Sequence, residues 1–200
     1  TMSEVSELYA DGKKIVAEVL RSSEVMKMAV GYLEEQNQES AQSWGSILLC
    51  TVKGDVHDIG KSLVEVVLHN NGLKVIDGGT EVGARELMAL IKKHEPQFIG
   101  FSGLLVRSAH EMVKILKSLD EAGVRLPVLV GGAAVSQKFV HQQMATAYTG
   151  PVVYCGDPLQ GVKAARKLLD PLVKDEFAKE LKGQHKPQVV KEKKVWKKKY

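Results

Sequence analysis

The sequence lacks several features that would assign it to a large class of proteins. It has only two cysteines, Cys50 and Cys155, with no CxxC spacing, so neither a disulfide framework nor a cysteine zinc site is expected. No apolar run approaches the roughly 20 residues that a membrane span needs, and no signal segment opens the chain. Neither a G-x-G-x-x-G fingerprint nor a P-loop is present, which counts against nucleotide binding. These absences favour a soluble, cytoplasmic protein.

The positive charge of the chain is concentrated at one end. The formal net charge is +4, but from residue 171 onward there are ten lysines against four acidic residues, so the preceding part is slightly acidic. A lysine-rich end could bind nucleic acid, yet only Trp196 and Tyr200 supply aromatic rings there, and Lys186-Pro187 is typical of a linker. We therefore predict a solvated basic linker or tail at residues 171–200 and no nucleic-acid partner.

The first 40 residues carry a helical pattern. Val25, Met26, Ala29, Val30 and Leu33 recur at helical spacing, which predicts a short helical segment. Two short helices cannot bury both of their faces, so this segment has to pack against something else. The polar stretch at residues 36–46 is typical of a linker.

Residues 45–170 show a repeating alternation of strand and helix. Short apolar runs predict strands at residues 47–51, 74–76, 98–102, 128–130 and 152–154. Amphipathic segments predict helices at residues 59–70, 84–94, 109–122, 137–147 and 159–169. This alternation is typical of a parallel sheet covered on both faces. We therefore predict an α/β fold with a flavodoxin-like (Rossmann-like) five-stranded parallel sheet and flanking helices, preceded by the short helical segment.

The notable polar and glycine residues follow the predicted strands. Because the carboxyl ends of parallel strands meet at one edge of such a sheet, where ligands commonly bind, these residues are expected to converge. They are Asp55, His57 and Asp58 after the first strand, Ser102 and Ser108 at the third, and Gly131-Gly132 at the fourth.

The first of three motifs is GDVHDIGK at residues 54–61. Asp55 and His57 stand two apart in a loop, so the carboxylate can hold one imidazole nitrogen while the other is presented to a metal. Gly54 and Gly60 allow the backbone to approach a bulky ligand. By itself, a D-x-H-x-x-G pattern is more often a surface histidine beside a helix-capping aspartate.

Two further motifs lie at the same predicted edge. In SGLLVRS (residues 102–108), both serines could donate hydrogen bonds into a cleft, and Gly103 removes a side chain from its floor. Ser108 is also suited to cap the helix that contains Glu111. In GGAA (residues 131–134), small residues admit a flat ring or a phosphate beside the sheet, although tight turns between strand and helix also use glycine.

Together the motifs resemble the cobalamin-binding region of the cobalamin-dependent methionine synthase family. The likeness runs through TVKGDVHDIGK at residues 51–61, GFSGL at residues 100–104 and LVGGA at residues 129–133, and it extends from about Leu8 to Asp170. It implies a cobalamin-binding α/β domain at residues 45–170 and a partial helical cap at residues 1–40. The family's cap is a four-helix bundle, so we expect this chain to be a fragment.

The resemblance also implies roles for individual residues. His57 would be the lower axial ligand of cobalt, with Asp55 and Ser108 completing a catalytic hydrogen-bonded relay. The residues that would bind the cofactor are Gly54, Asp55, Val56, His57, Asp58, Gly60, Ser102, Leu104, Val106, Ser108, Gly131, Gly132, Tyr9 and Val16.

Six residues of that set have a more specific expectation. The nucleotide tail of the cofactor would enter the sheet near Ser102 and Gly131-Gly132. Tyr9 and Val16 fall where the family's cap covers the upper face of the cofactor. Val106 stands where the family often has threonine, which puts one polar contact to the cofactor in doubt.

The function implied by the resemblance is methyl carriage. In that family cob(I)alamin takes a methyl group from methyltetrahydrofolate, and methylcobalamin passes it to homocysteine. The partners would be the homocysteine, folate and S-adenosylmethionine (reactivation) domains of a larger methyltransferase, so turnover by this chain alone is not expected. Alternatives are a corrinoid carrier of methylamine or methanol methyltransferases, a mutase subunit, a cofactor-free flavodoxin-like interaction module, and a zinc site at His57 and Asp58.

Overall fold

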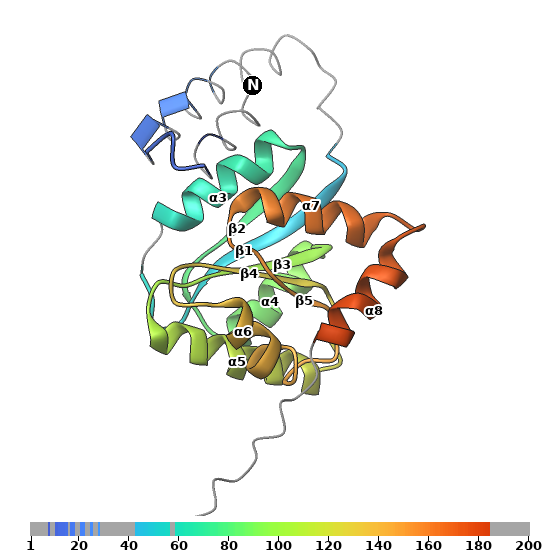
Figure 1. Cartoon of the computed structure of the whole chain (residues 1–200). Helices are drawn as coiled ribbons and strands as arrows, with labels where there is room; N and C mark the ends of the chain where they lie inside the picture. Colours follow the sequence, from blue (N-terminus) through green and yellow to red (C-terminus); the bar gives the residue numbers. More distant parts are fainter. Residues whose placement is uncertain are drawn as a thin grey trace, which may run out of the picture.

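A five-stranded parallel sheet forms the centre of the described part of the chain, with strand order β2-β1-β3-β4-β5 (Figure 1). The structure, a computed structural model, describes residues 43–56 and 59–184, together with Leu8, Val25, Met28 and residues 11–15, 17–18 and 21–22. The strands are β1 (Gly45–Val52), β2 (Leu73–Val82), β3 (Phe98–Ser102), β4 (Val128–Gly131) and β5 (Val152–Tyr154). The predicted flavodoxin-like sheet is confirmed.

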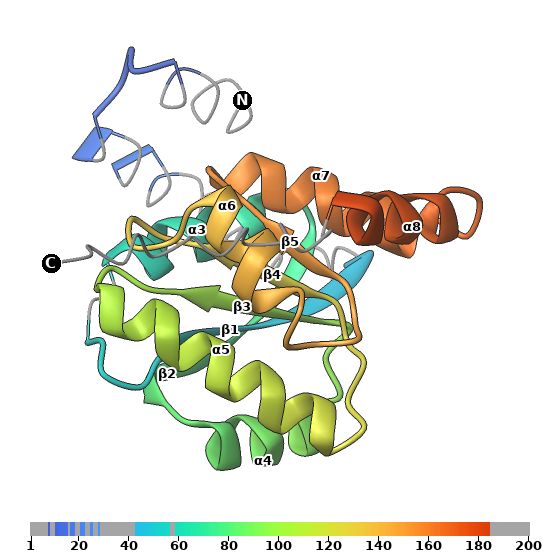
Figure 2. The ribbon, with the colours of Figure 1, turned by 60° about the horizontal axis from the view of Figure 1, so that its bottom comes forward.

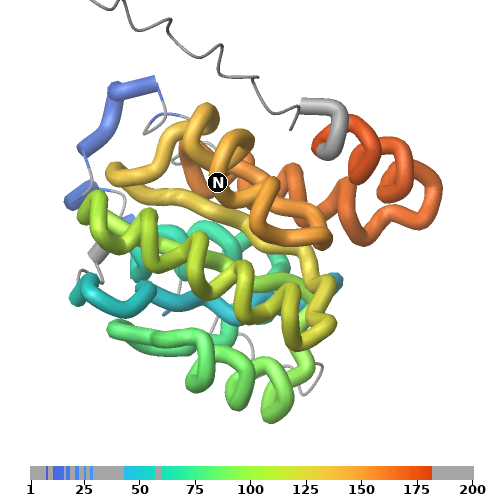
Figure 3. Tube along the Cα trace, turned by 90° about the horizontal axis from the view of Figure 1, so that it is seen from below, coloured from blue at the N-terminus to red at the C-terminus, as the bar shows by residue number. Residues whose placement is uncertain are grey.

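Helices cover both faces of this sheet. They are α3 (Ile59–Asn70), α4 (Ala84–His94), α5 (Val106–Glu121), α6 (Gln137–Phe139), the π-helix η1 (Val140–Met144), α7 (Pro158–Leu169) and α8 (Lys174–Gln184). Helices α3 and α7 pack together on one face, while α4 and α5 lie on the other (Figure 2). The α6–η1 segment lies beside α5 on that second face, as the view from below shows (Figure 3). None of the helices in the described residues combines the length and apolarity of a membrane span.

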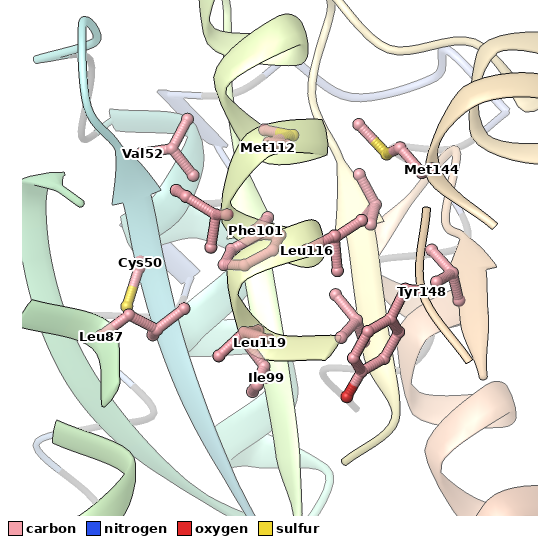
Figure 4. Packing of buried hydrophobic residues seen from close by; sticks show 14 of the residues in the cluster. Cys50, Val52, Leu87, Ile99, Phe101, Met112, Leu116, Leu119, Met144 and Tyr148 are labelled. Carbon is pink, nitrogen blue, oxygen red and sulfur yellow. The ribbon is translucent and has the colours of Figure 1, made fainter. Parts of the chain in front are cut away.

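The alternation of side chains along each strand divides the core into two clusters. Leu48 and Cys50 of β1 face α4 and α5, whereas Ile47 faces α3 and α7. On the α5 side, buried side chains such as Leu116 pack over Phe101 of β3 (Figure 4). Each fully buried side chain of this size contributes about 1.5–3 kcal/mol, so the two clusters hold the strand ends in fixed positions.

The edge strand β2 is longer than its sequence indicates. A strand was predicted only at residues 74–76, but β2 continues to Val82. Its pairing with β1 shifts register twice, and Gly79 and Glu81 have positive φ values of 88° and 58°. The polar, glycine-containing second half is tolerated because it lies at an edge, where bulges interrupt the ladder locally. The second half of β2 therefore could not be predicted from an alternation of apolar and polar residues.

The segment predicted as one helix at residues 137–147 is divided. Residues 137–139 form α6, and residues 140–144 form the π-helix η1, in which Ala145 N donates to Val140 O at 2.9 Å. This hydrogen bond joins residues five positions apart, which defines the wider turn of a π-helix. Its apolar side chains Val140 and Met144 are still buried in the α5-side cluster.

The prediction of a solvated linker from residue 171 onward was wrong for residues 174–184, which form α8. Leu181 is only 5% exposed and belongs to the same cluster as Leu168 of α7. Lys167 of α7 also lies over the ring of Phe177, 4.9 Å from its centroid. The many lysines of this segment made it read as a solvated linker. Phe177 and Leu181, four positions apart, nevertheless pack a short helix against α7.

We expect Leu181→Ala to lower the free energy of unfolding by about 2–4 kcal/mol, because it empties a buried position between α7 and α8. Leu172→Ala is the matched control: Leu172 is 90% exposed, so its truncation should change the free energy by less than about 0.5 kcal/mol. Urea unfolding of the two variants measures the difference. Equal midpoints would show that α8 does not contribute to the folded domain.

Candidate functional site

The carboxyl edge of the sheet gathers most of the residues predicted to be functional. The loop after β1 contains Asp55, Ser102 is the last residue of β3, and Gly131 is the last residue of β4. Ser108 lies in the first turn of α5, which begins at Val106, earlier than predicted. These positions place the loops after β1, β3 and β4 side by side.

Asp55 is fully buried and joins two of these loops. Its Oδ2 accepts hydrogen bonds from the backbone N–H groups of Leu104, at 2.6 Å, and Leu105, at 3.3 Å, and from Ser108 Oγ at 3.0 Å. The two N–H groups stand at the start of α5, where the helix dipole favours negative charge. The carboxylate is therefore held in one position by three donors.

Ser108 takes part both in helix capping and in the contact with Asp55. Leu105 is the residue before α5 and has no side chain that can accept a hydrogen bond, but its N–H donates to Ser108 Oγ at 3.2 Å. The Ser108 hydroxyl has one hydrogen, which it can direct to Asp55 Oδ2 or to Leu105 O. The two interpretations of Ser108 from sequence are thus compatible.

Backbone contacts fix the loop that carries Asp55. Arg107 Nε donates to Gly54 O at 2.6 Å, and Glu81 N donates to Asp55 O at 3.3 Å. Gly54 has a φ of 86°, which glycine adopts at little cost. Sequence reasoning missed Arg107 and Glu81, because contacts to a backbone carbonyl leave no residue pattern to detect.

Four of the predicted site residues lie outside the described residues. They are His57, the predicted metal ligand, with Asp58, Tyr9 and Val16. Among the residues that are described, no group of three or more His, Cys, Asp or Glu side chains could hold a metal ion.

A cavity of about 130 Å³ lies between the sheet and helices α3 and α7. Of the predicted residues, Gly60, Ser102, Gly131 and Gly132 line it. Its wall also includes residues that sequence reasoning did not select, namely Val64, Leu68, Cys155, Gly156, Asp157 and Gly161. Because several positions are glycines, backbone rather than side chains forms much of the wall. Ser102, Gly131 and Gly132 place part of this wall at the carboxyl edge of the sheet.

Cys155 is the titratable thiol in this wall. Burial, reinforced by the nearby charge of Asp157, raises its pKa to about 12. A thiol with such a pKa stays protonated at neutral pH and is a poor nucleophile or metal ligand. Cys155 thus contributes an apolar surface to the cavity.

Gly132 is required by a close approach of two loops. Its φ is 113°, and a Cβ at this position would lie 2.1 Å from Gly103 O. At Gly103 a Cβ would lie 2.7 Å from the Met112 side chain and 2.9 Å from Ser108 Oγ. The two glycines let the loops after β3 and β4 come into contact beside the cavity.

Large apolar side chains are exposed around Asp55. Val56 is 67% exposed, Leu104 46% and Val106 71%. We call these three residues the apolar rim. Exposed large apolar side chains that gather in one patch are typical of a binding surface. A flat ligand with an apolar face and a narrow appendage suits this combination of rim and cavity.

Comparisons with known proteins agree with this geometry. Two family models, both described as B12 binding domain, match the chain, one over residues 45–154 and the other over residues 1–34. The chain is 40% identical over 166 residues to methionine synthase of Mycobacterium tuberculosis (strain ATCC 25618 / H37Rv), which covers 81% of this chain. It spans only 14% of that protein's length.

Solved structures show the same likeness. The methanol:cobalamin methyltransferase complex MtaBC from Methanosarcina barkeri superposes with a TM-score of 0.74 at 28% identity, over 90% of this chain and 68% of that chain. A cobalamin-binding protein from Desulfitobacterium hafniense DCB-2 has a TM-score of 0.67 at 24% identity, over 82% of this chain and 76% of that chain. The second likeness is one of fold.

We expect Gly132→Ala to lower the free energy of unfolding by about 3 kcal/mol or more, because the new Cβ collides with Gly103 O and the backbone is strained. Gly123→Ala is the matched control, since Gly123 also has a positive φ (75°) but no atom near a Cβ. It should cost about 1–2 kcal/mol. Chemical denaturation compares the two. Equal losses would mean that the contact between the loops is not tight.

Proposed function

Since the chain belongs to the B12-binding domain family, we propose that it is the cobalamin-carrying module of a methionine synthase, which moves a methyl group from methyltetrahydrofolate to homocysteine. The 40% identity to methionine synthase supports this assignment. Because the chain spans 14% of that relative, the homocysteine, folate and reactivation domains would be supplied by the rest of a larger enzyme. This chain alone would then carry the methyl group without turning over substrate.

The observation that carries the proposal is the position of the cavity relative to the apolar rim. Cobalamin has a broad corrin ring with a nucleotide tail attached to it. The rim of Val56, Leu104 and Val106 offers an apolar surface to the ring, and the glycine-lined cavity offers a narrow slot to the tail. Both lie at the carboxyl edge, since Ser102 of the cavity wall and Leu104 of the rim are only two positions apart in the chain. The described residues therefore fit the cofactor.

The proposed roles of the chain's own residues follow from these contacts. When bound, cobalamin supplies a cobalt centre that accepts and releases the methyl group. His57 would hold the cobalt, and Asp55 would orient the His57 ring through a hydrogen bond. Ser108 and the N–H groups of Leu104 and Leu105 keep the Asp55 carboxylate in place. With His57 free of metal, Asp55 and His57 would share a proton.

Residues of the apolar rim and the cavity would exclude water from the bound cofactor. Ser102, Gly131 and Gly132 would border the nucleotide tail, with Gly60 on the opposite wall. Val106 has no hydroxyl to offer, so it would contribute an apolar contact only. Tyr9 and Val16 would belong to a cap over the other face of the ring.

We expect His57→Gly to change the visible spectrum of the cobalamin-loaded protein. The variant should lose the absorption of cobalamin ligated by a protein histidine, since no imidazole is left on the loop, while its thermal unfolding stays close to that of the parent. His94→Gly, an exposed histidine at the end of α4, is the control and should keep the parent spectrum. An unchanged spectrum in His57→Gly would rule out His57 as the ligand.

A second candidate is a corrinoid carrier for another methyltransferase. The superposition with the methanol:cobalamin methyltransferase complex at 28% identity favours it. The methyl donor distinguishes the two: with the missing modules added in trans, the loaded chain should be methylated from methyltetrahydrofolate and not by a methanol-activating system. Methylation from methanol alone would replace the first proposal with the second.

A further inference from the structure

Among the described residues of the GDVHDIGK motif, Lys61 occupies a position that is unfavourable for its charge. It lies in the first turn of α3, and its side chain is only 5% exposed. Burial removes the ammonium from water, and the start of a helix is electrostatically unfavourable for a cation. The first turn of α3 contains no acidic residue to offset it. Lys61 is therefore stabilised from outside its own helix.

The partner is Asp77 of β2. Lys61 Nζ forms an ion pair with Asp77 Oδ1, which also accepts a hydrogen bond from Gly79 N at 2.8 Å. Burial acts to raise the pKa of Asp77, but the hydrogen bonds from Lys61 and Gly79 outweigh it and lower that pKa below its ordinary value. Asp77 is thus ionised at neutral pH, and its charge is directed at the first turn of α3.

Strand alternation places Asp77 on the α3 side of β2, the side on which Leu73 and Val75 also lie, and a bulge follows it. Asp77 pairs with Leu49 and Gly79 with Cys50, so Gly78 is an extra residue in the ladder. A Cβ on Gly78 would lie 2.2 Å from Cys50 Sγ, so only glycine fits there. Because Asp77 is the last residue of the regular ladder between β2 and β1, its backbone position does not depend on the ion pair. Asp77 can therefore act as a fixed anchor.

The start of α3 is one end of the short segment that contains His57, so its position limits where that segment can lie. Only residues 57 and 58 lie between Val56 and Ile59, and an extended residue reaches at most about 3.6 Å. The Val56 end is held by Asp55, Arg107 and Glu81 through the hydrogen bonds described above. The other end adjoins Gly60, which lines the cavity.

We infer that Lys61 and Asp77 form a positioning pair for cobalamin binding: by tying the first turn of α3 to β2, they set the cavity wall at Gly60 and the end of the loop that contains His57. This inference rests on the proposed function. Neither residue touches the reacting atoms in this scheme. Their effect is exerted through the backbone of α3.

Lys61→Met tests the pair by removing the charge while keeping most of the aliphatic stem. Titration with methylcobalamin, followed by visible absorption, should show an affinity lower on the order of tenfold, as for other supporting contacts of metal ligands. The spectrum should contain a larger share of cobalamin without a protein ligand. Thermal unfolding without cofactor should change little, because Asp77 is 53% exposed and stays solvated.

Asp77→Asn removes the same ion pair from the other side. Its affinity for methylcobalamin should fall by a similar factor, but its thermal midpoint should also fall, because a buried ammonium loses its partner. Lys114→Met is the matched control, since Lys114 forms an exposed ion pair with Glu111 on α5. It should alter neither affinity nor stability.

The outcomes separate this inference from the proposed function. Parent-like affinity and spectrum in Lys61→Met would overturn the positioning role, and so would an equal loss of affinity in Lys114→Met. If Lys61→Met does not fold, the affinity of Asp77→Asn decides in the same way. An unchanged spectrum in His57→Gly would instead overturn the proposed ligand, whatever the Lys61 variants do.

Discussion

The burial of the Asp55 carboxylate at the start of α5 is the interaction on which the carboxyl edge depends. A buried carboxylate is costly unless donors surround it, and here the donors come from the loop after β3 and from Ser108. This requirement ties the loop after β1 to the loop after β3. The close contact of Gly103 with Gly132 then ties in the loop after β4. The Asp55 carboxyl group and the glycine contact together fix the relative position of three loops that are far apart in the sequence.

The rest of the domain keeps these loops in register. The two apolar clusters place β1, β3 and β4 side by side, so that all three end at the same level. The cavity lies between the sheet and helices α3 and α7, and glycines form part of its wall. The site is therefore formed by a rigid arrangement of strand ends rather than by any single long loop.

Much of this arrangement could be predicted from the sequence because it follows from local periodicity. The apolar strand at residues 47–51 and the amphipathic helix at residues 59–70 predict a parallel sheet, and a parallel sheet places Asp55 and Ser108 at one edge. The second half of β2 could not be predicted, since its polar residues pair through bulges that depend on packing with Cys50. Helix α8 was missed because its stability comes from contact with α7.

The predicted site divides in the same way. The small-residue motif predicted the part of the cavity wall near Gly131-Gly132. Cys155, Asp157 and Gly161 also line the cavity, but no sequence motif marks them, because only the folded chain brings them there. Arg107 and Glu81 act on backbone carbonyls, for which any donor would serve. The positions of His57 and Asp58 lie outside the described residues, so their roles stay predictions.

The support of Asp55 by main-chain donors has a consequence for how this surface can vary. The N–H groups of Leu104 and Leu105 remain whatever side chains those two positions carry, proline excepted. Mutation can therefore alter the exposed side chains of Leu104 and Val106 without removing the support of the carboxylate beneath them. Selection on the shape or polarity of the outer surface is thus separated from selection on the buried Asp55 carboxyl group. Related proteins could therefore differ in the ligand or partner that this surface accepts and still keep Asp55 supported in the same way.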